Sequence, residues 1–265
     1  MSRYSQRTQT GSPSLSSWGQ KVVSGGITWG IATGGSSSSI TDNSQAYTLL
    51  QFTSDGTLTV TKEGTFEFLM VGGGGPAGTN FIGRTYGDSG GSGGEVRTFD
   101  MILPVGTYAV DVGANQAATI FATGTAYEAY VNYGNAGYVT GEFSTGSEDV
   151  VPIWRQIHSR GSAVTTKTPF AQTSVTSPAT NVKFYNSGRG NFNVSNAACS
   201  GPTLTFTGSS VVYGSGGGYT NGTQGTGGGA RGVNPTANRG GGGGGGDSNG
   251  GHTSGATGFV AVRFQ

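Results

Sequence analysis

Residues 240–246 of this chain read Gly-Gly-Gly-Gly-Gly-Gly-Gly and open the last of three glycine-rich blocks. The blocks span Gly72–Gly94, Gly214–Gly232 and Gly240–Gly258. Glycine supplies 53 of the 265 residues, about three times its usual share. Glycine at this density forms a flexible linker, a collagen helix, a phosphate-binding loop or a packed layer of chain segments. Deciding among these four decides the fold.

Three of the four do not fit. Collagen needs glycine at every third position and abundant proline, whereas these runs are contiguous and the chain has 8 prolines. A linker joins separable domains, but the last block leads into the strand-like stretch Gly258–Phe264. A dinucleotide-binding loop requires a strand–helix–strand unit, and no helical periodicity follows any block. Calcium-binding repeats are not expected either, because the glycine-Asp pieces at Asp88 and Asp247 do not recur at a fixed period.

A packed glycine layer remains. Glycine segments in a polyproline II-like conformation have no side chains to separate them, so their backbones can approach and hydrogen-bond to one another. Ordering glycine costs much conformational entropy, so such a layer needs strands that hold the ends of its segments. Strand-like stretches flank each block, and they are expected to supply this support.

Short β-branched and aromatic runs predict the strands. The first three are Tyr47–Phe52, Thr57–Thr61 and Thr65–Val71, separated by hairpin-type turns at Ser54-Asp55-Gly56 and Lys62-Glu63-Gly64. The third run places Phe66, Phe68 and Met70 on one face by strict alternation.

Further runs extend the same pattern. Glu95–Leu103 and Thr107–Val112 are expected to pair across Pro104-Val105-Gly106, and later strands are expected at Thr203–Thr207, Ser210–Tyr213 and Gly258–Phe264. Val150–His158 is the best helical candidate. The sequence therefore predicts an all-β fold, an antiparallel β-sandwich framework with packed glycine-rich, polyglycine II-like segments.

Composition divides the chain into three parts. Residues 1–46 are rich in Ser, Thr, Gly and Gln and indicate either a disordered tail or an extended N-terminal docking arm ordered by a partner, with Tyr4, Trp18 and Trp29 as its anchors. Residues 47–112 and 201–265 form the glycine-rich β framework. Residues 113–200, where aromatic and charged residues concentrate, are interpreted as an insertion in that framework.

Charge and composition exclude several function classes. A net charge of +1 argues against nucleic-acid binding, and the single Cys199 allows neither an internal disulfide nor a cysteine-based zinc site. No signal peptide or membrane-spanning stretch is visible, so membrane insertion is not expected. His158 and His252 have no catalytic or metal-binding spacing, and Glu142, Glu148 and Asp149 are more typical of a solvated loop than of a glycosidase pair. We expect no enzyme activity, no cofactor, and no catalytic or metal-binding residues.

Several stretches resemble the glycine-rich domain of bacteriophage tail-fibre and related virion proteins. They are Gly64-Thr65-Phe66-Glu67-Phe68-Leu69-Met70-Val71-Gly72-Gly73-Gly74-Gly75, Gly90-Gly91-Ser92-Gly93-Gly94-Glu95-Val96, Leu103–Gly113 and the closing Gly258–Phe264. In its glycine blocks the chain also looks like the tip adhesins of T-even-type phages. The resemblance covers roughly Thr57–Val112 and Thr203–Phe264. It implies a β framework with packed glycine segments, a place in the virion after assembly in the host cytoplasm, and a multimer, with a homotrimer favoured.

The expected function is therefore that of a virion structural protein, a tail fibre or capsid-attached fibre that acts as an adhesin on the host surface. The alternative is a head decoration or cement protein, and a surface polysaccharide depolymerase is a third class. The arm would bind other virion proteins, and the insertion would contact a host glycan or protein. Aromatic rings stack on sugars and Arg groups hydrogen-bond to them. The candidate receptor-binding residues are Tyr127, Tyr130, Tyr133, Trp154, Arg155, Tyr185 and Arg189.

Overall fold

The computed structural model describes residues 27–78, 89–136, 179–185, 187–188, 190, 198, 200–219, 223–246 and 250–265. Within these ranges the protein is all-β and contains no helix, and so no helix that could cross a membrane. The strands are β1 (Ile31–Thr33), β2 (Ser36–Asp42), β3 (Gln45–Phe52), β4 (Gly56–Lys62), β5 (Gly64–Val71), β6 (Val96–Leu103), β7 (Gly106–Asp111), β8 (Thr119–Phe121), β9 (Ala129–Val131), β10 (Thr180–Tyr185), β11 (Thr203–Leu204), β12 (Val211–Val212) and β13 (Phe259–Phe264).

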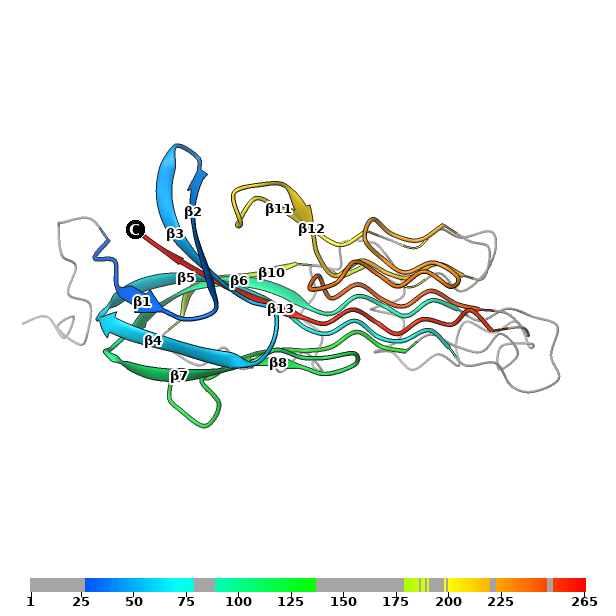
Figure 1. Cartoon of the computed structure of the whole chain (residues 1–265), viewed down its shortest axis with the longest axis horizontal. Helices are drawn as coiled ribbons and strands as arrows, with labels where there is room; N and C mark the ends of the chain where they lie inside the picture. Colours follow the sequence, from blue (N-terminus) through cyan, green and yellow to red (C-terminus); the bar gives the residue numbers. More distant parts are fainter. Residues whose placement is uncertain are drawn as a thin grey trace, which may run out of the picture.

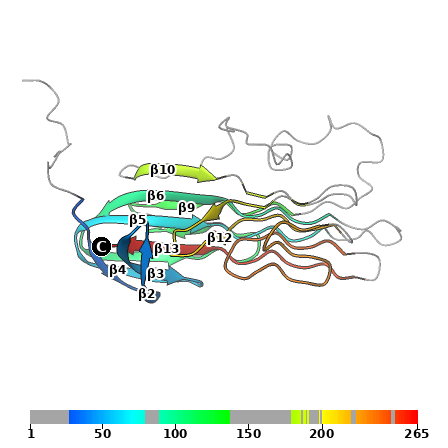
Figure 2. The same cartoon turned by 90° about the horizontal axis from the view of Figure 1, so that it is seen from above.

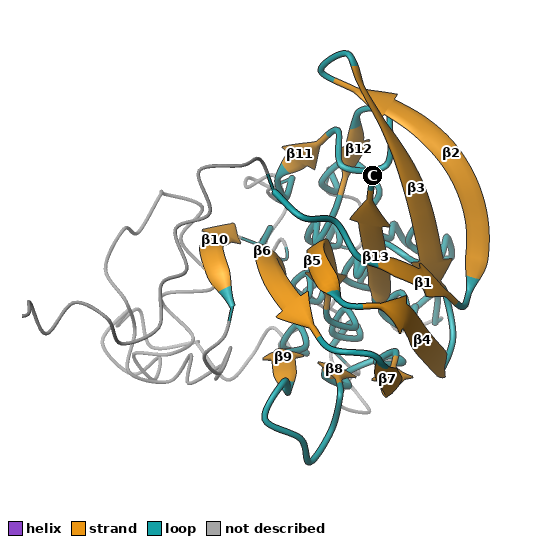
Figure 3. Ribbon diagram, turned by 90° about the vertical axis from the view of Figure 1, so that its left-hand side faces the viewer, coloured by secondary structure: helices purple, strands orange, loops and turns teal. Residues whose placement is uncertain are grey.

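Two antiparallel sheets face each other. The larger has the order β10-β6-β5-β13-β3-β2 and the smaller the order β1-β4-β7-β8-β9 (Figures 1 and 3). The strands β11 and β12 form a separate hairpin. The predicted antiparallel sandwich is confirmed.

The core between the sheets follows from the alternation of the strands. Phe66, Phe68 and Met70 of β5 are buried on the inner face, as predicted. Phe68 stacks on Phe99 at 5.0 Å between ring centroids and meets Phe121 of the opposite sheet at 4.8 Å. Aromatic pairs of this kind stabilise a core beyond the area that they bury.

A second apolar cluster covers part of the outer face of the six-stranded sheet. There the β11–β12 hairpin and its flanks lay Phe206 and Tyr213 over outward-facing residues of β3, β5, β6 and β13. The members of that sheet surface are Leu49, Leu69, Val71, Val96, Phe259 and Ala261. The central strands are thus buried on both faces, which explains why Leu69, Met70 and Val71 are all apolar.

The glycine-rich segments continue directly from strand ends. β5 runs into residues 72–78, residues 89–95 lead into β6, and residues 250–258 lead into β13. Figures 1 and 2 show these segments running side by side away from the sheets. We call residues 72–78, 89–95, 132–135, 214–219, 225–230, 240–246 and 253–258 the glycine bundle.

The hydrogen bonds of the bundle recur every third residue. The N–H groups of Gly72, Gly75 and Gly78 donate to the carbonyls of Glu95, Ser92 and Ser89, at 2.9, 2.9 and 3.0 Å. The intervening N–H groups bond elsewhere: those of Gly74 and Ala77 donate to Ala256 and Thr253, at 2.8 and 3.1 Å.

A chain with three residues per turn and no internal hydrogen bonds has this pattern, because successive peptide groups point to different neighbours. A further pair of contacts shows the same spacing: Gly91 and Gly94 donate to Gly243 and Gly240, both at 2.8 Å. The bundle is therefore a polyglycine II-like layer, as predicted, in which neighbouring segments satisfy one another's backbone groups.

Three predicted hairpins are wrong. The turns at Ser54-Asp55-Gly56, Lys62-Glu63-Gly64 and Pro104-Val105-Gly106 each connect strands of different sheets, since β4 and β7 pair with each other in the five-stranded sheet. They are corners of the sandwich.

Element boundaries also differ from those predicted. Residues 31–46, assigned to the arm, form β1, β2 and the start of β3, and residues 113–200, assigned to the insertion, contribute β8, β9 and β10 to the sheets. β11 and β12 are shorter than the predicted Thr203–Thr207 and Ser210–Tyr213. The helical candidate Val150–His158 lies outside the described residues.

Candidate functional site

The candidate site is built around Arg263 of β13. Its Nε donates to Glu67 Oε2 at 2.5 Å, and its Nη1 donates to Asp42 Oδ2 at 2.7 Å and to the carbonyl of Phe206 at 3.2 Å. The guanidinium also lies 4.4 Å from the ring centroids of both Tyr47 and Phe206. Four residues therefore contact the Arg263 side chain: Glu67, Asp42, Phe206 and Tyr47.

Strand register explains this arrangement. Arg263 is the direct cross-strand partner of Glu67, and alternation turns both away from the inner core. Asp42 ends β2 at the edge of the same sheet, and Phe206 follows β11. The side chains of Arg263 and Asp42 are each 12% exposed, so the ion pair is largely desolvated. Burial alone lowers the pKa of Arg263, but the hydrogen bonds to Asp42 and Glu67 outweigh it, and the pKa lies above its ordinary value.

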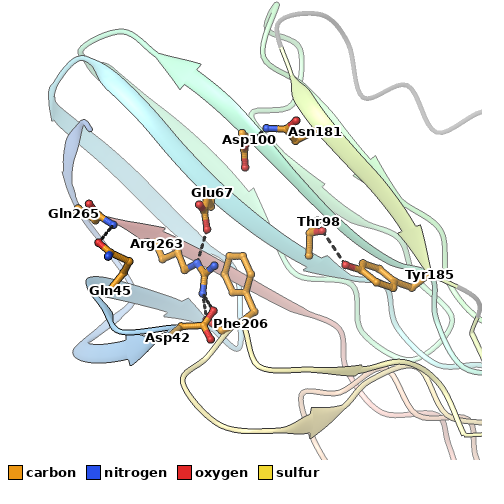
Figure 4. A network of polar contacts seen from close by, with 10 residues as sticks. All are labelled: Asp42, Gln45, Glu67, Thr98, Asp100, Asn181, Tyr185, Phe206, Arg263 and Gln265. Carbon is orange, nitrogen blue, oxygen red and sulfur yellow. Dashed lines mark hydrogen bonds and ion pairs between the residues drawn. The ribbon is translucent and has the colours of Figure 1, made fainter. Parts of the chain in front are cut away.

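A groove of about 540 Å³ lies beside this cluster on the outer face of the six-stranded sheet. Its floor comes from β5, β6 and β13, one wall from β10, and the other from the chain that follows β11. Figure 4 shows several of its polar side chains, among them those of Glu67, Asp100 and Tyr185. The volume is typical of a site for a small molecule or a short segment of a polymer.

The β10 wall is shaped by a bulge. Thr180 pairs with Asp100 and Lys183 with Thr98, so β10 has one more residue than β6 over this stretch, and Asn181 has φ 52°. The amide Nδ2 of Asn181 donates to Asp100 Oδ2 at 2.5 Å. Further along, the hydroxyls of Tyr185 and Thr98 lie 3.3 Å apart. The bulge therefore sets the polar side chains of β10 against those of β6.

Two carboxylates lie side by side on the floor. Glu67 of β5 and Asp100 of β6 are direct cross-strand partners, a placement that like charges disfavour. Each is compensated by a different neighbour, Glu67 by Arg263 and Asp100 by the Asn181 amide. The groove therefore combines carboxylate acceptors on its floor with amide, amine and hydroxyl donors on its wall.

A second polar cluster lies where the sheets meet the glycine bundle. Arg97 of β6 is fully buried, and its Nε donates to Glu95 Oε1 at 2.8 Å, while Nη2 contacts the same oxygen. The other carboxylate oxygen of Glu95 accepts the N–H of Asn132 at 2.9 Å. Desolvation lowers the pKa of Arg97 below its ordinary value, although Glu95 acts in the opposite direction. This cluster ties β6 to the segment that follows β9.

Of the predicted receptor-binding residues that the structure describes, Tyr185 alone lines the groove. Tyr127 packs edge-on against Tyr108 of the core, with 5.8 Å between ring centroids, and the hydroxyl of Tyr130 donates to Asn132 Oδ1. Tyr133 is exposed. These three belong to β9 and its flanks in the five-stranded sheet, so the described tyrosines do not form one cluster.

The other predicted residues are placed as follows. Trp154, Arg155, Arg189, Tyr4 and Trp18 lie outside the described residues. Trp29 is half-buried, packs against the inner core and meets Tyr47 edge-on at 5.9 Å between centroids. Its proposed role in virion docking stays a prediction.

Arg263, Glu67, Asp42 and Asp100 were not predicted as site residues. Arg263 could have been identified from the alternation of Gly258–Phe264, which sets it on the face opposite Val260 and Val262. A charged residue on the outer face of an otherwise apolar strand indicates a local partner. The part of the chain that the structure describes holds no group of three or more His, Cys, Asp or Glu side chains placed to bind a metal ion.

Comparison with known protein families gives one match. A family model described as a glycine-rich domain covers residues 52–265. The chain belongs to this glycine-rich domain family. The match takes in the glycine bundle, the groove floor and both walls, while β1, β2 and most of β3 precede it. Comparisons with curated proteins and with solved structures return no match.

Proposed function

We propose that this glycine-rich domain protein is a non-enzymatic structural protein of a bacteriophage particle, a tail fibre or capsid-attached fibre that binds the host cell surface. The observation that carries the proposal is the glycine bundle. Its segments are bonded backbone to backbone, and β5, β6, β9 and β13 continue directly into segments of the bundle. A body of this kind offers an extended support and almost no side chains for chemistry.

The resemblance of Gly64–Gly75 and of Leu103–Gly113 to tail-fibre glycine-rich domains supports the same function. In this proposal the sandwich and the bundle form the body, and the residues that precede β1 bind other virion proteins. Homotrimers are the favoured assembly. The protein would reach the virion after assembly in the host cytoplasm.

Binding rather than catalysis is supported by the groove. Glycoside hydrolysis needs two carboxyl groups that are available to the sugar, one on each side of the scissile bond. Here Glu67 and Asp100 come from neighbouring strands on one floor, and each is already bonded to a side chain of the protein. Carboxylates arranged in this way are suited to hold a ligand by accepting its hydrogen bonds.

The test is to locate the protein and to measure what it binds. Antibodies against the purified full chain should label the tail or the fibres of the particle in electron microscopy, and the purified protein should adsorb to host cells and compete with the phage. Labelling spread over the head, with particles that lose thermal stability when the protein is missing, would show a decoration protein instead. Release of oligosaccharides from host envelopes would contradict the non-enzymatic assignment.

A further inference from the structure

We propose that the groove on the outer face of the six-stranded sheet binds an uncharged, hydroxyl-rich saccharide. The inference rests on the proposed host-binding function and names the ligand class and the residues. It moves the expected contact surface from the tyrosines near β9 to the floor and wall formed by β5, β6, β10 and β13.

The charges of the groove exclude anionic ligands. Asp42, Glu67 and Asp100 line it, against Arg263 and Lys183 as the cations. The charge of Arg263 is already compensated by the carboxylates of Glu67 and Asp42, so this side chain offers little net attraction to a phosphate or a carboxylate. Among the described residues that line the groove, Lys183, exposed on the wall, is the remaining cation. A uronate or phosphate would therefore meet more negative than positive charge.

The hydrogen-bonding groups match sugar hydroxyls. A carboxylate only accepts hydrogen bonds, and an ammonium group only donates them. Asp100 accepts one bond from Asn181 and keeps further acceptor capacity, while Lys183 and the Tyr185 hydroxyl face the groove from the wall. A hydroxyl donates and accepts at once, so adjacent hydroxyls on a sugar can bridge floor and wall. A purely cationic ligand would leave the donors of the wall unpaired, and an aliphatic ligand would leave both the donors and the floor acceptors unpaired, which is costly in a partly buried site.

Tyr185 gives the wall an amphipathic surface. Its ring is half-buried beside the second apolar cluster, and its hydroxyl lies 3.3 Å from that of Thr98. A tyrosine held in this way offers an apolar ring to the C–H face of a sugar while its polar end stays hydrogen-bonded. The groove is open to solvent, which leaves room for the rest of a saccharide chain beyond the bound sugars.

The experiment uses the full chain on an array of bacterial surface polysaccharides, with neutral, uronate-containing and phosphate-containing members. The wild-type protein should bind neutral members only. Asp100→Asn and Tyr185→Ala should each weaken that binding about tenfold or more, as expected for a lost charged hydrogen bond or a lost stacking surface. Asp111→Asn is the matched control, because Asp111 also accepts a side-chain hydrogen bond, from Thr123 at 2.7 Å, but lies in the other sheet. It should bind like the wild type.

Three results would overturn the inference: binding to anionic members alone, binding that the groove variants leave unchanged, or no binding to any saccharide on the array. Circular dichroism and unfolding curves for each variant separate loss of binding from loss of fold. Adsorption to host cells is measured in parallel. If Asp100→Asn and Tyr185→Ala still adsorb to host cells, the groove is not the binding site, but the proposed adhesin function stands. If the protein binds saccharides on the array but does not adsorb to cells, the adhesin function is contradicted, but saccharide binding by the groove stands.

Discussion

A Cβ atom on Gly242 would overlap the carbonyl oxygen of Gly91. Gly242 does not have a positive φ, so glycine is required here by the neighbouring segment and not by its own backbone conformation. Gly124 is the reverse case: it has φ +75° and nothing within 4 Å of an added Cβ. The chain thus uses glycine for two separate reasons, and the first predominates in the bundle, where Gly214, Gly227 and Gly240 also have positive φ.

Replacing Gly242 by alanine should destabilise the protein by about 3 kcal/mol or more, because the backbone of the neighbouring segment must move to admit the methyl group. Urea unfolding measures the change. Gly106→Ala is the matched control: Gly106 begins β7, and its added Cβ would lie 3.4 Å from the Tyr108 hydroxyl, an ordinary contact. It should change the free energy of unfolding by less than about 1 kcal/mol. Equal losses in the two variants would contradict the packed layer.

The buried pair of Arg97 and Glu95 makes a second prediction. Arg97→Met should cost about 3–5 kcal/mol, because it leaves the Glu95 carboxylate without its cation beside a desolvated site. The double variant Arg97→Met/Glu95→Gln should recover part of that loss in a double-mutant cycle. Lys183→Met, at an exposed cation, should stay within about 0.5 kcal/mol of the wild type. Strictly additive losses would show that the pair is not coupled.

The sequence predicted the inner core and the glycine layer, since both follow from short-range rules. Alternation assigns Phe66 and Phe68 to one face, and a glycine run between strands has few ways to satisfy its backbone. It did not predict which turns are corners, because Asp55-Gly56 is equally suited to a hairpin and to a sheet crossing. The β2–β3 hairpin was not predicted, because its turn contains no glycine to mark it. Its turn residues Asn43 and Ser44 nevertheless both have positive φ.

The groove could be predicted only in part. Tyr185 was chosen as an exposed aromatic residue, but its partners come from strands as distant in sequence as β2, β6 and β13. Their meeting depends on the sheet order, which places β13 between β5 and β3. Local patterns contain no information on that order, so the ion pairs of Arg263 could not be assigned beforehand.

Alkaline pH should destabilise the protein through Tyr213. Burial raises the pKa of Tyr213, whose side chain is 3% exposed and stacks on Phe259. The folded protein then holds the phenol proton more tightly than the unfolded chain, where the pKa is about 10. The contribution of Tyr213 to the free energy of unfolding is complete below about pH 10 and is lost as the pH rises further.

Urea unfolding at a series of alkaline pH values measures this loss. Tyr213→Phe should make it smaller, and Tyr133→Phe, at an exposed tyrosine, should not. Identical slopes in both variants would assign the loss to other groups.

Arg263→Lys tests whether the planar guanidinium, rather than its charge, organises the groove. Lysine keeps the charge but cannot donate to Glu67 and Asp42 from two fixed directions or stack flat between Tyr47 and Phe206. We expect a loss of about 1–3 kcal/mol in the free energy of unfolding. Reduced protection from hydrogen exchange should be confined to the β2–β3 hairpin and the chain around Phe206, since Arg263 joins both to β13. The control Thr107→Lys changes an exposed position of β7 in the other sheet and should leave the protection of the hairpin unchanged. If Arg263→Lys matched the wild type in both measurements, charge alone would be sufficient and the stacked geometry would have no role in shaping the groove.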